Sequence, residues 1–333
     1  MSETGIGIIG AGVHMKANIA PSLFRLGRRI AAVATAHPET AQAAANQLHA
    51  PKYFGDYRKM LEAPIDVVFI ATRGEDHARI VSDCLAAGKH VFVDKPLGLT
   101  EPQARAVAEQ ADKAQRRVAV GFMKRYAPAY VRLKELMTGS RELGKAWSFR
   151  AMFAITSGRE GWVDEKYLKF GAIHYVDLLR HYFGEPVEVL GLCNSEGVKV
   201  DEAYVLRFDS GVVGSLFLAG LPAWRRHYEE ITVTFEDGFA QVDNIAKFVM
   251  HREAQSRVGV IRWQEVDERD EVFTSVGTSS SGGWKELYLN GYVGEVEAFL
   301  KAVEQNADIS NSATDNIRTV KMCDSMLEAL KTR

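Results

Sequence analysis

The feature that most constrains the fold is an alternation of short apolar runs with helical patterns over residues 5–122. Runs such as GIGIIG (5–10), DVVFIAT (66–72) and HVFVD (90–94) have the length and composition of buried strands. Between them lie segments such as EPQARAVAEQADKAQ (101–115), whose apolar residues recur with a helical period. Strands that alternate with crossover helices predict an α/β domain with a parallel sheet covered on both faces.

The pattern changes after residue 122. Strand-like runs follow at 145–155, 202–209, 211–220, 229–237 and 259–266, with turns such as DSG and EDG between several of them. This pattern of short strands and turns predicts a large, mostly antiparallel sheet. Two helical patterns follow at the end of the chain. We therefore predict two domains, 1–122 and an α+β domain over 123–333, whose C-terminal helices could pack back on the first domain.

Composition narrows the class of protein. The chain has 333 residues, 47% of them hydrophobic, and a net charge of −2, which gives no indication of a nucleic-acid or membrane-surface partner. Its three cysteines are scattered without CxxC spacing, and no HExxH motif is present, so no metal site is predicted. The N-terminus moves straight into a strand without a basic, apolar leader, which predicts a cytoplasmic protein.

The turn after the first strand carries a glycine pattern. In GIIGAGVHM, Gly10 and Gly12 follow the strand and precede a helix. Glycine there permits a tight turn and close approach of a pyrophosphate to the helix N-terminus. Met15 occupies the third position of GxGxxG, so the motif is incomplete, and an ordinary glycine-rich turn fits the same residues. The position within an α/β pattern favours dinucleotide binding.

The second strand ends without the acid that binds the ribose 2′-hydroxyl of NAD. Thr35 occupies that place and His37 follows two residues later. No carboxylate there repels a 2′-phosphate, and both side chains can bind one, so NADP is favoured over NAD as cofactor. The alternative is that Thr35 simply caps the next helix.

Two further segments contain candidates for chemistry. Lys95 directly precedes Pro96 at the carboxyl end of a predicted parallel strand, where ligands bind in such sheets. His174 and Asp177 are three residues apart and share one face of a predicted helix. A histidine beside a carboxylate can act as a general acid or base. A surface lysine and a surface His–Asp pair explain the same spacings.

These segments together resemble the Gfo/Idh/MocA family, which includes glucose–fructose oxidoreductase and inositol dehydrogenase. The matching stretches are GIIGAG (7–12), IAT (70–72) with His77, AAGKHVFVDKPL (86–97), VGFMKRYAPAY (120–130), HYVDLLRHYFG (174–184) and GEVEAFLKAV (294–303). The resemblance implies a Rossmann domain followed by an open-sheet α+β domain. It also implies a homodimer or homotetramer formed through that sheet.

The resemblance also implies roles for individual residues. Lys95 corresponds to the lysine of the family's Glu-Lys-Pro motif, with Asp94 in place of the glutamate, and His174 corresponds to the catalytic histidine. The predicted cofactor-binding residues are Gly10, Gly12, Val13, His14, Thr35, His37, Thr72, His77, Asp94 and Lys95. The predicted substrate contacts are Arg125, Tyr126 and Asp177, with Trp162 and Lys169 from a segment that could equally be an ordinary surface loop.

One departure concerns the mechanism. The family commonly has an aspartate four residues before the histidine, and this chain has Phe170 there and Ala172 two residues before it. Asp177 could substitute for that aspartate, or Phe170 could form an apolar floor for the substrate. The expected function is NAD(P)-dependent hydride transfer at a secondary alcohol of a sugar or polyol. The alternatives are an NAD-dependent glycoside hydrolase and a non-enzymatic dinucleotide or sugar sensor.

Overall fold

The structure is a computed structural model that describes residues 4–138, 142–156, 165–220, 227–252, 269–274 and 283–331. The chain forms two compact units. The first comprises Met1–Met123 and Gly291–Lys321, and the second comprises Lys124–Asn290 and Met322–Arg333. Residues 291–321 thus belong to the first unit, although the sequence pattern assigned them to the second domain.

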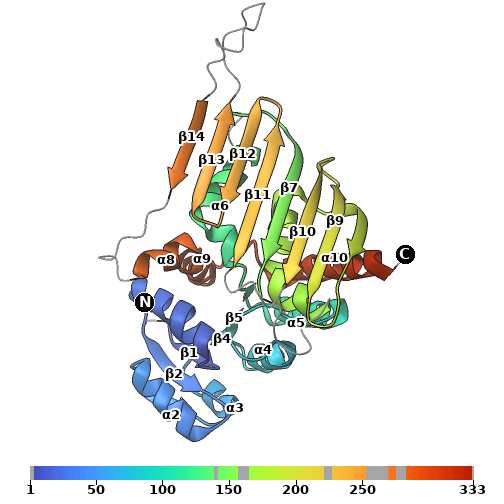
Figure 1. The fold of residues 1–333 in the computed structure, drawn as a ribbon. Coiled ribbons are helices and arrows are strands. Elements are labelled where there is room, and N and C mark those ends of the chain that lie inside the picture. Colours follow the sequence, from blue (N-terminus) through green and yellow to red (C-terminus); the bar gives the residue numbers. More distant parts are fainter. Residues whose placement is uncertain are drawn as a thin grey trace, which may run out of the picture. The chain divides into compact units, whose positions relative to one another are not determined.

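The first unit contains the predicted parallel sheet. Its six strands run in the order β3-β2-β1-β4-β5-β6, and every neighbouring pair is parallel. They are β1 (Ile6–Ile9), β2 (Ile30–Ala34), β3 (Lys52–Phe54), β4 (Val67–Ile70), β5 (His90–Val93) and β6 (Val118–Val120). Strands β1 and β4 are buried along their whole length. This explains why they appear in the sequence as uninterrupted apolar runs. Figure 1 shows the sheet with its helices.

Three crossover helices lie where the sequence predicts them: α2 (Pro38–Gln47), α4 (His77–Ala86) and α5 (Glu101–Ala114). A further short helix, α3 (Tyr57–Leu61), was not predicted. In α5 the side chain of Thr100 caps the N-terminus, and Pro102 lies in the first turn, where its missing N–H costs nothing. The helix ends at Gln115, which adopts the left-handed conformation.

The helical run after β1 is irregular, and Pro21 explains why. Residues 15–19 form a π-helical segment, η1 (Met15–Ile19), before α1 (Ala20–Arg25) begins. Proline has no N–H and cannot complete the α-helical bond to the carbonyl four residues earlier. A wider π turn directly before it accommodates the missing bond. The helix predicted after the glycine turn is therefore present, but it is not a regular α-helix.

The core of the first unit joins the sheet to a helix from the end of the chain. Helix α9 (Tyr292–Gln305) packs against η1 and α1. Its Phe299 ring lies 5.7 Å from the ring of Phe69 on β4 and 5.8 Å from that of Phe92 on β5. Val296 and Leu300 of α9 lie in the same apolar cluster. These contacts fix the N-terminal turn of α9 close to the strands.

The second unit is built on an eight-stranded sheet. Its order is β14-β13-β12-β11-β7-β10-β9-β8, and only β7 and β10 pair in parallel. The strands are β7 (Ala146–Ala154), β8 (Pro186–Cys193), β9 (Val200–Phe208), β10 (Val213–Gly220), β11 (Tyr228–Phe235), β12 (Gly238–Asp243), β13 (Lys247–Arg252) and β14 (Arg269–Thr274). The predicted mostly antiparallel sheet is confirmed. The strand expected at 259–266 lies outside the described residues.

The helices α6 (Pro128–Thr138) and α7 (Ile173–Phe183) and the π-helical segment η4 (Tyr167–Ala172) pack against one face of this sheet (Figure 1). The second unit also contains α8 (Trp284–Leu289) and the end of α10 (Ala313–Lys331), which begins in the first unit. The end of α7 is capped by Lys134 of α6, whose ammonium donates to the carbonyl of His181 at 2.5 Å. Among the helices that the structure describes, none has the length and apolar run needed to cross a bilayer.

Candidate active site

The predicted cofactor residues lie along one edge of the parallel sheet. Because all six strands run the same way, the residues that follow β1, β2, β4 and β5 share the carboxyl edge, where ligands bind in such sheets. These residues are Gly10, Thr35, Thr72 and Asp94. A Cβ on Gly10 would lie 2.8 Å from the Cγ2 of Thr72, so the β1 and β4 turns touch.

The glycine turn has the two properties that a pyrophosphate site needs. Gly10 has a φ of +84°, and a Cβ there would lie only 2.4 Å from the carbonyl oxygen of Ala71. Gly12 is exposed, and a Cβ there would meet no atom within 4 Å. The next residue, Val13, is 85% exposed at the start of the helical run. The first glycine is therefore required by the fold, while the second leaves open space at a helix N-terminus that fits a dinucleotide.

Substitutions at these two glycines are expected to affect different properties, stability at Gly10 and cofactor affinity at Gly12. Gly10→Ala is expected to cost about 1–3 kcal/mol of unfolding free energy, because it places a side chain on a left-handed backbone against Ala71. Gly12→Val is expected to leave stability unchanged and to raise the Kd for NADH by about 10-fold or more, roughly 1.4 kcal/mol or more. Urea unfolding and NADH fluorescence titration measure the two effects. Equal loss of stability in both variants would contradict this division of roles.

The end of β2 carries no carboxylate. The Thr35 hydroxyl lies 2.6 Å from that of Thr40 and donates to the carbonyl of His37 at 2.9 Å. His37 is exposed and precedes α2 in an extended conformation, without a side-chain capping bond. Thr35 thus bonds to the turn before α2 but does not cap this helix, because its N-cap residue is His37 and the helix has no side-chain capping bond. Its role toward a 2′-phosphate stays a prediction.

The loop after β5 holds Lys95 through its two neighbours. The Asp94 carboxylate accepts the backbone N–H of Lys95 at 2.8 Å, and the carbonyl of Pro96 accepts a hydrogen bond from the Nδ1 of His77 at 2.8 Å. The Lys95–Pro96 peptide bond is cis. The ring of His77 is buried and binds this loop through Nδ1, and its contact with the cofactor stays a prediction. We therefore assign it to positioning the loop that carries Lys95.

His14 connects the glycine turn to the same loop. The amide nitrogen of Asn18 lies 3.0 Å from the Nδ1 of His14, and this contact orients the ring. The Nε2 of the same ring is 3.9 Å from a carboxylate oxygen of Asp94. The ring also packs edge-on against Tyr292 of α9, with centroids 5.6 Å apart. His14 and Asp94, both predicted cofactor residues, are thereby brought together.

In the second unit, His174 lies in the first turn of α7. The preceding segment η4 is π-helical, a feature that often marks functional sites. Phe170, four residues before His174, lies within η4 and is half-buried. Asp177, one turn later on α7, is 1% exposed and binds Arg125 with both of its oxygens.

Arg125 and Asp177 form a buried pair rather than an open polar surface. The Nε and Nη2 atoms of Arg125 donate to the two carboxylate oxygens at 2.7 and 2.5 Å, and the arginine side chain is 3% exposed. Such a two-pronged pair satisfies a buried charge that would otherwise be costly. Both residues were predicted to contact substrate, but these bonds tie α7 to the segment that contains Arg125. They place Asp177 with Arg125, not at the position of the missing aspartate.

A second buried network lies beside this pair, and sequence reasoning missed it. Lys124 forms an ion pair with Glu229 of β11, and Tyr130 donates to Glu229 at 2.7 Å. The hydroxyl of Tyr175, the neighbour of His174, lies 3.0 Å from that of Tyr130. Burial, reinforced by the charge of Glu229, raises the pKa of Tyr175 well above its usual range. Tyr175 therefore stays neutral, and its contact with Tyr130 helps to hold α7 in place.

Three predicted substrate residues remain, which are Lys169, Tyr126 and Trp162. Lys169 is buried, and its ammonium lies 3.0 Å from Glu165 and 2.8 Å from Asp324 of α10. Burial opposes its charge, but the bonds from Asp324 and Glu165 outweigh that and raise the pKa of Lys169. This lysine thus anchors η4 to α10. Tyr126 is half-buried, and Trp162 lies outside the described residues.

Comparison with known proteins agrees with this geometry. Residues 4–122 match the model of the oxidoreductase family described as GFO_IDH_MocA, with an NAD-binding Rossmann fold. The inositol 2-dehydrogenase/D-chiro-inositol 3-dehydrogenase of Halalkalibacterium halodurans is 26% identical over 332 residues, which cover 97% of this chain and 90% of that protein. The inositol 2-dehydrogenase of Paracoccus denitrificans is 27% identical over 342 residues, 97% and 93% of the two chains. The N-terminal third of the chain is thus similar to the NAD-binding domain of the Gfo/Idh/MocA oxidoreductases, and nearly the whole chain is similar to inositol dehydrogenases.

The fold of this chain is similar to that of solved structures along its whole length. A dehydrogenase from Chromobacterium violaceum superposes with a TM-score of 0.87 at 19% identity, covering 99% of this chain and 96% of that one. Levoglucosan dehydrogenase in complex with NADH and L-sorbose gives a TM-score of 0.84 at 21% identity, with coverage of 99% and 97%. Within the described part of the chain, no group of three or more His, Cys, Asp or Glu residues is arranged to hold a metal ion.

Proposed function

We propose that this protein is a Gfo/Idh/MocA oxidoreductase, an NAD(P)-dependent dehydrogenase that acts on a secondary alcohol of a sugar or polyol. The observation that carries the proposal is the position of Lys95. It lies at the carboxyl edge of the same parallel sheet whose first turn leaves open space at Gly12. The relatives are inositol dehydrogenases, and their activity supports this class of substrate.

Each proposed residue has a separate chemical task. Gly12 and the helix N-terminus bind the pyrophosphate, and Asp94 and His77 hold the loop of Lys95. The nicotinamide, when bound, supplies the hydride acceptor or donor. Lys95 hydrogen-bonds the reacting oxygen and stabilises the negative charge that develops on it. His174 takes the hydroxyl proton during oxidation, or returns it during reduction.

The test is a screen of polyols and sugars with NAD and NADP, in which absorbance reports the reduced nicotinamide. Inositols and anhydrosugars belong in the first set, because relatives and structural neighbours act on or bind them. We expect turnover with at least one secondary alcohol. Because β2 ends in Thr35 without a carboxylate, we expect a higher kcat/KM with NADP than with NAD. Cofactor binding without turnover of any compound would contradict the proposal.

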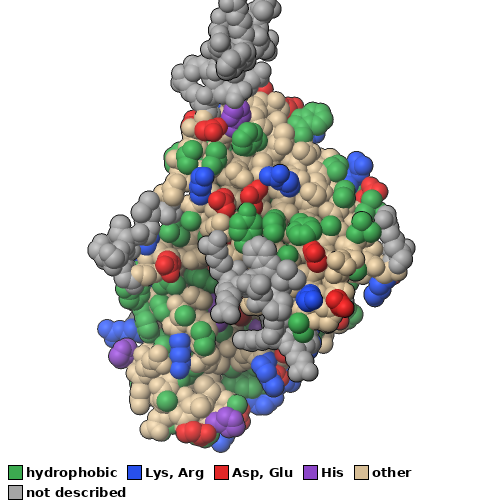
Figure 2. Space-filling view, viewed as in Figure 1, with side chains coloured by type: hydrophobic (Ala, Val, Ile, Leu, Met, Phe, Trp, Pro, Cys, Tyr) green, Lys and Arg blue, Asp and Glu red, His purple; other side chains and the backbone are tan. Residues whose placement is uncertain are grey.

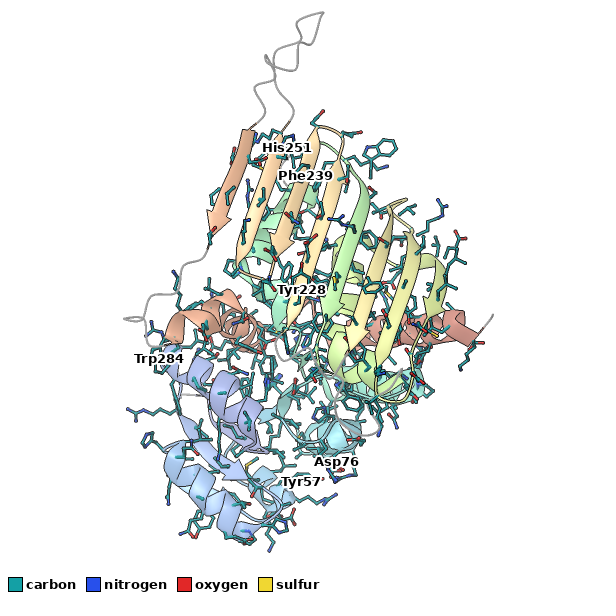
Figure 3. The ribbon with its side chains drawn as sticks, in the orientation of Figure 1. Tyr57, Asp76, Tyr228, Phe239, His251 and Trp284 are labelled. Carbon is teal, nitrogen blue, oxygen red and sulfur yellow. The ribbon has the colours of Figure 1, made fainter. Side chains whose placement is uncertain are left out.

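We also propose that the open face of the eight-stranded sheet forms a homodimer or homotetramer. Leu192, Ala203, Phe217 and Met152 are successive cross-strand partners on that face. Leu190 and Val205 form the next row, and both are about half exposed. Figure 2 shows hydrophobic side chains on this face between charged ones, and Figure 3 shows Phe239 beside His251 on neighbouring strands. An apolar face of this kind fits a self-complementary interface.

Phe217→Glu is expected to dissociate the oligomer, because it places a charge in the middle of the apolar row. Size-exclusion chromatography with light scattering measures the mass. Lys59→Glu, an exposed change on α3 of the first unit and away from this sheet, is the control and should leave the mass unchanged. A wild-type chain that stays monomeric at micromolar concentration would contradict the interface.

A further inference from the structure

Tyr130 of α6 is a buried tyrosine whose hydroxyl group connects a strand to a second helix. The hydroxyl donates a hydrogen bond to the carboxylate of Glu229 on β11 at 2.7 Å, and it lies 3.0 Å from the hydroxyl of Tyr175 on α7. A tyrosine hydroxyl has one proton, and here that proton points to Glu229. The hydroxyl of Tyr175 is therefore the donor to Tyr130, and the hydrogen bonds run in one direction from α7 to β11.

The acceptor at the end of these hydrogen bonds is fixed in place. Glu229 lies in β11, which is paired with a strand on each side, and its carboxylate also binds the ammonium of Lys124. That ammonium lies between 5.7 and 5.9 Å from the ring centres of Tyr130, Phe153 and Tyr175, which hold it among them. Because Glu229 cannot shift independently of its strand, Tyr130 ties α7 to a rigid part of the sheet.

This tie reaches α7 directly beside His174. Tyr175 is the next residue of the chain and lies in the same first turn of the helix. On the other side of His174, η4 is π-helical, a turn that is rare in proteins. Tyr167 at the start of η4 donates to the carbonyl of Ala219 on β10 at 2.6 Å. His174 therefore lies between two tyrosines that attach its segment to the sheet, and the nearer one is held through Tyr130.

Other contacts keep α7 docked without this one. Tyr182, near the end of α7, donates to the backbone carbonyl of Tyr130 at 2.9 Å, and Lys134 caps the last turn. Phe183 stacks on Phe149 of β7 with ring centres 4.9 Å apart. The contact between the hydroxyls of Tyr130 and Tyr175 is therefore not required for α7 to pack. Its specific effect is on the first turn of the helix.

We propose that Tyr130 is a positioning residue for the dehydrogenase reaction, whose hydroxyl fixes the first turn of α7 and thereby the place of His174. The inference rests on the proposed role of His174 in proton transfer. A displacement of a catalytic group by about 1 Å can lower the rate by about 100-fold. Phenylalanine at position 130 keeps the ring and its packing but removes the acceptor of the Tyr175 hydroxyl. The first turn of α7 is then expected to shift.

The experiment compares Tyr130→Phe with Tyr182→Phe as a matched control. Both variants remove one buried tyrosine hydroxyl between α6 and α7, but Tyr182 lies about two turns further along α7 than His174. Both should lower the urea midpoint of unfolding, because each leaves a buried polar group without its partner.

Only Tyr130→Phe should lower kcat, by about 10–100-fold, while the KM for the sugar and the Kd for NADH stay near the wild-type values. Tyr182→Phe should keep the kcat of the wild type. The same kcat in both variants would overturn the proposal, because it would show that the Tyr130 hydroxyl contributes to stability alone.

Tyr175→Phe removes the same contact from the other side and leaves the bond between Tyr130 and Glu229 intact. It should lower kcat by a factor similar to that of Tyr130→Phe. The double variant Tyr130→Phe/Tyr175→Phe should lower kcat no further, because both changes act through one contact. If Tyr130→Phe does not fold, Tyr175→Phe decides the question, and normal turnover in it would rule the positioning role out.

Amide hydrogen exchange provides a readout that does not depend on turnover. The peptide containing residues 173–177 should exchange faster in Tyr130→Phe and Tyr175→Phe than in the wild type, because the first turn of α7 has lost its attachment. It should remain unchanged in Tyr182→Phe. Unchanged exchange of this peptide in Tyr130→Phe and Tyr175→Phe would contradict the proposed positioning.

Variants in the background of His174→Ala separate this inference from the proposed function. If His174→Ala turns over normally, the role of His174 is wrong, and the positioning role of Tyr130 is wrong with it. If His174→Ala has lost most of its turnover, adding Tyr130→Phe should lower the residual rate very little, because Tyr130 acts through His174. A full further loss in that background, or normal turnover of Tyr130→Phe alone, would remove the positioning role and leave the role of His174 intact.

Discussion

Lys95→Met is expected to lower kcat by about 10²–10⁴-fold, the range that positioned proton-transfer and electrostatic groups typically contribute. The methionine side chain fills similar space but cannot hydrogen-bond the reacting oxygen or stabilise its charge. The pyrophosphate site at Gly12 does not depend on this side chain, so the Kd for NADH should change little. Steady-state kinetics with the compound found in the screen and NADH fluorescence titration measure the two quantities.

Two companion variants make this result specific. His174→Ala should lower kcat by a similar factor and remove the limb of the pH–rate profile that reports the proton acceptor. Lys59→Met changes an exposed lysine of α3 in the same unit and should be indistinguishable from the wild type. Near-normal turnover in both Lys95→Met and His174→Ala would exclude the proposed pair.

The parallel sheet could be predicted because each of its main strands is recognisable from its own short stretch of sequence. Strands β1, β4 and β5 are buried on both faces, so each appears as an uninterrupted apolar run between helical patterns. The carboxyl-edge positions of Gly10, Thr35 and Asp94 then follow from the common strand direction. The edge strand β8 and the interior strands β12 and β13 were not predicted, because their polar and apolar residues mix in short runs that also fit loops.

The partners of buried charges could not be predicted, because they depend on tertiary contacts. Arg125 and Asp177 are 52 residues apart, and nothing in either local sequence indicates that they bind each other. The same holds for His77, whose partner is a carbonyl 19 residues away.

Arg125→Met is expected to lower the free energy of unfolding of the second unit by about 3–5 kcal/mol. The substitution removes the guanidinium and the two hydrogen bonds that it donates to the buried carboxylate of Asp177. Urea unfolding followed by far-UV circular dichroism measures the change. Because Asp177 is one turn from His174 on α7, the same variant should lower kcat more than it raises the KM for substrate.

The double variant Arg125→Met/Asp177→Leu tests whether the loss comes from the buried charge of Asp177. Replacing both partners with apolar side chains removes the buried charge, so most of the lost stability should return. Arg207→Met breaks an exposed pair with Glu188 on the same sheet and should change stability by less than about 1 kcal/mol. If Arg125 were instead a substrate contact, Arg125→Met would raise the KM and leave stability unchanged. The ratio of these two effects therefore decides between a residue that holds α7 and one that binds the sugar.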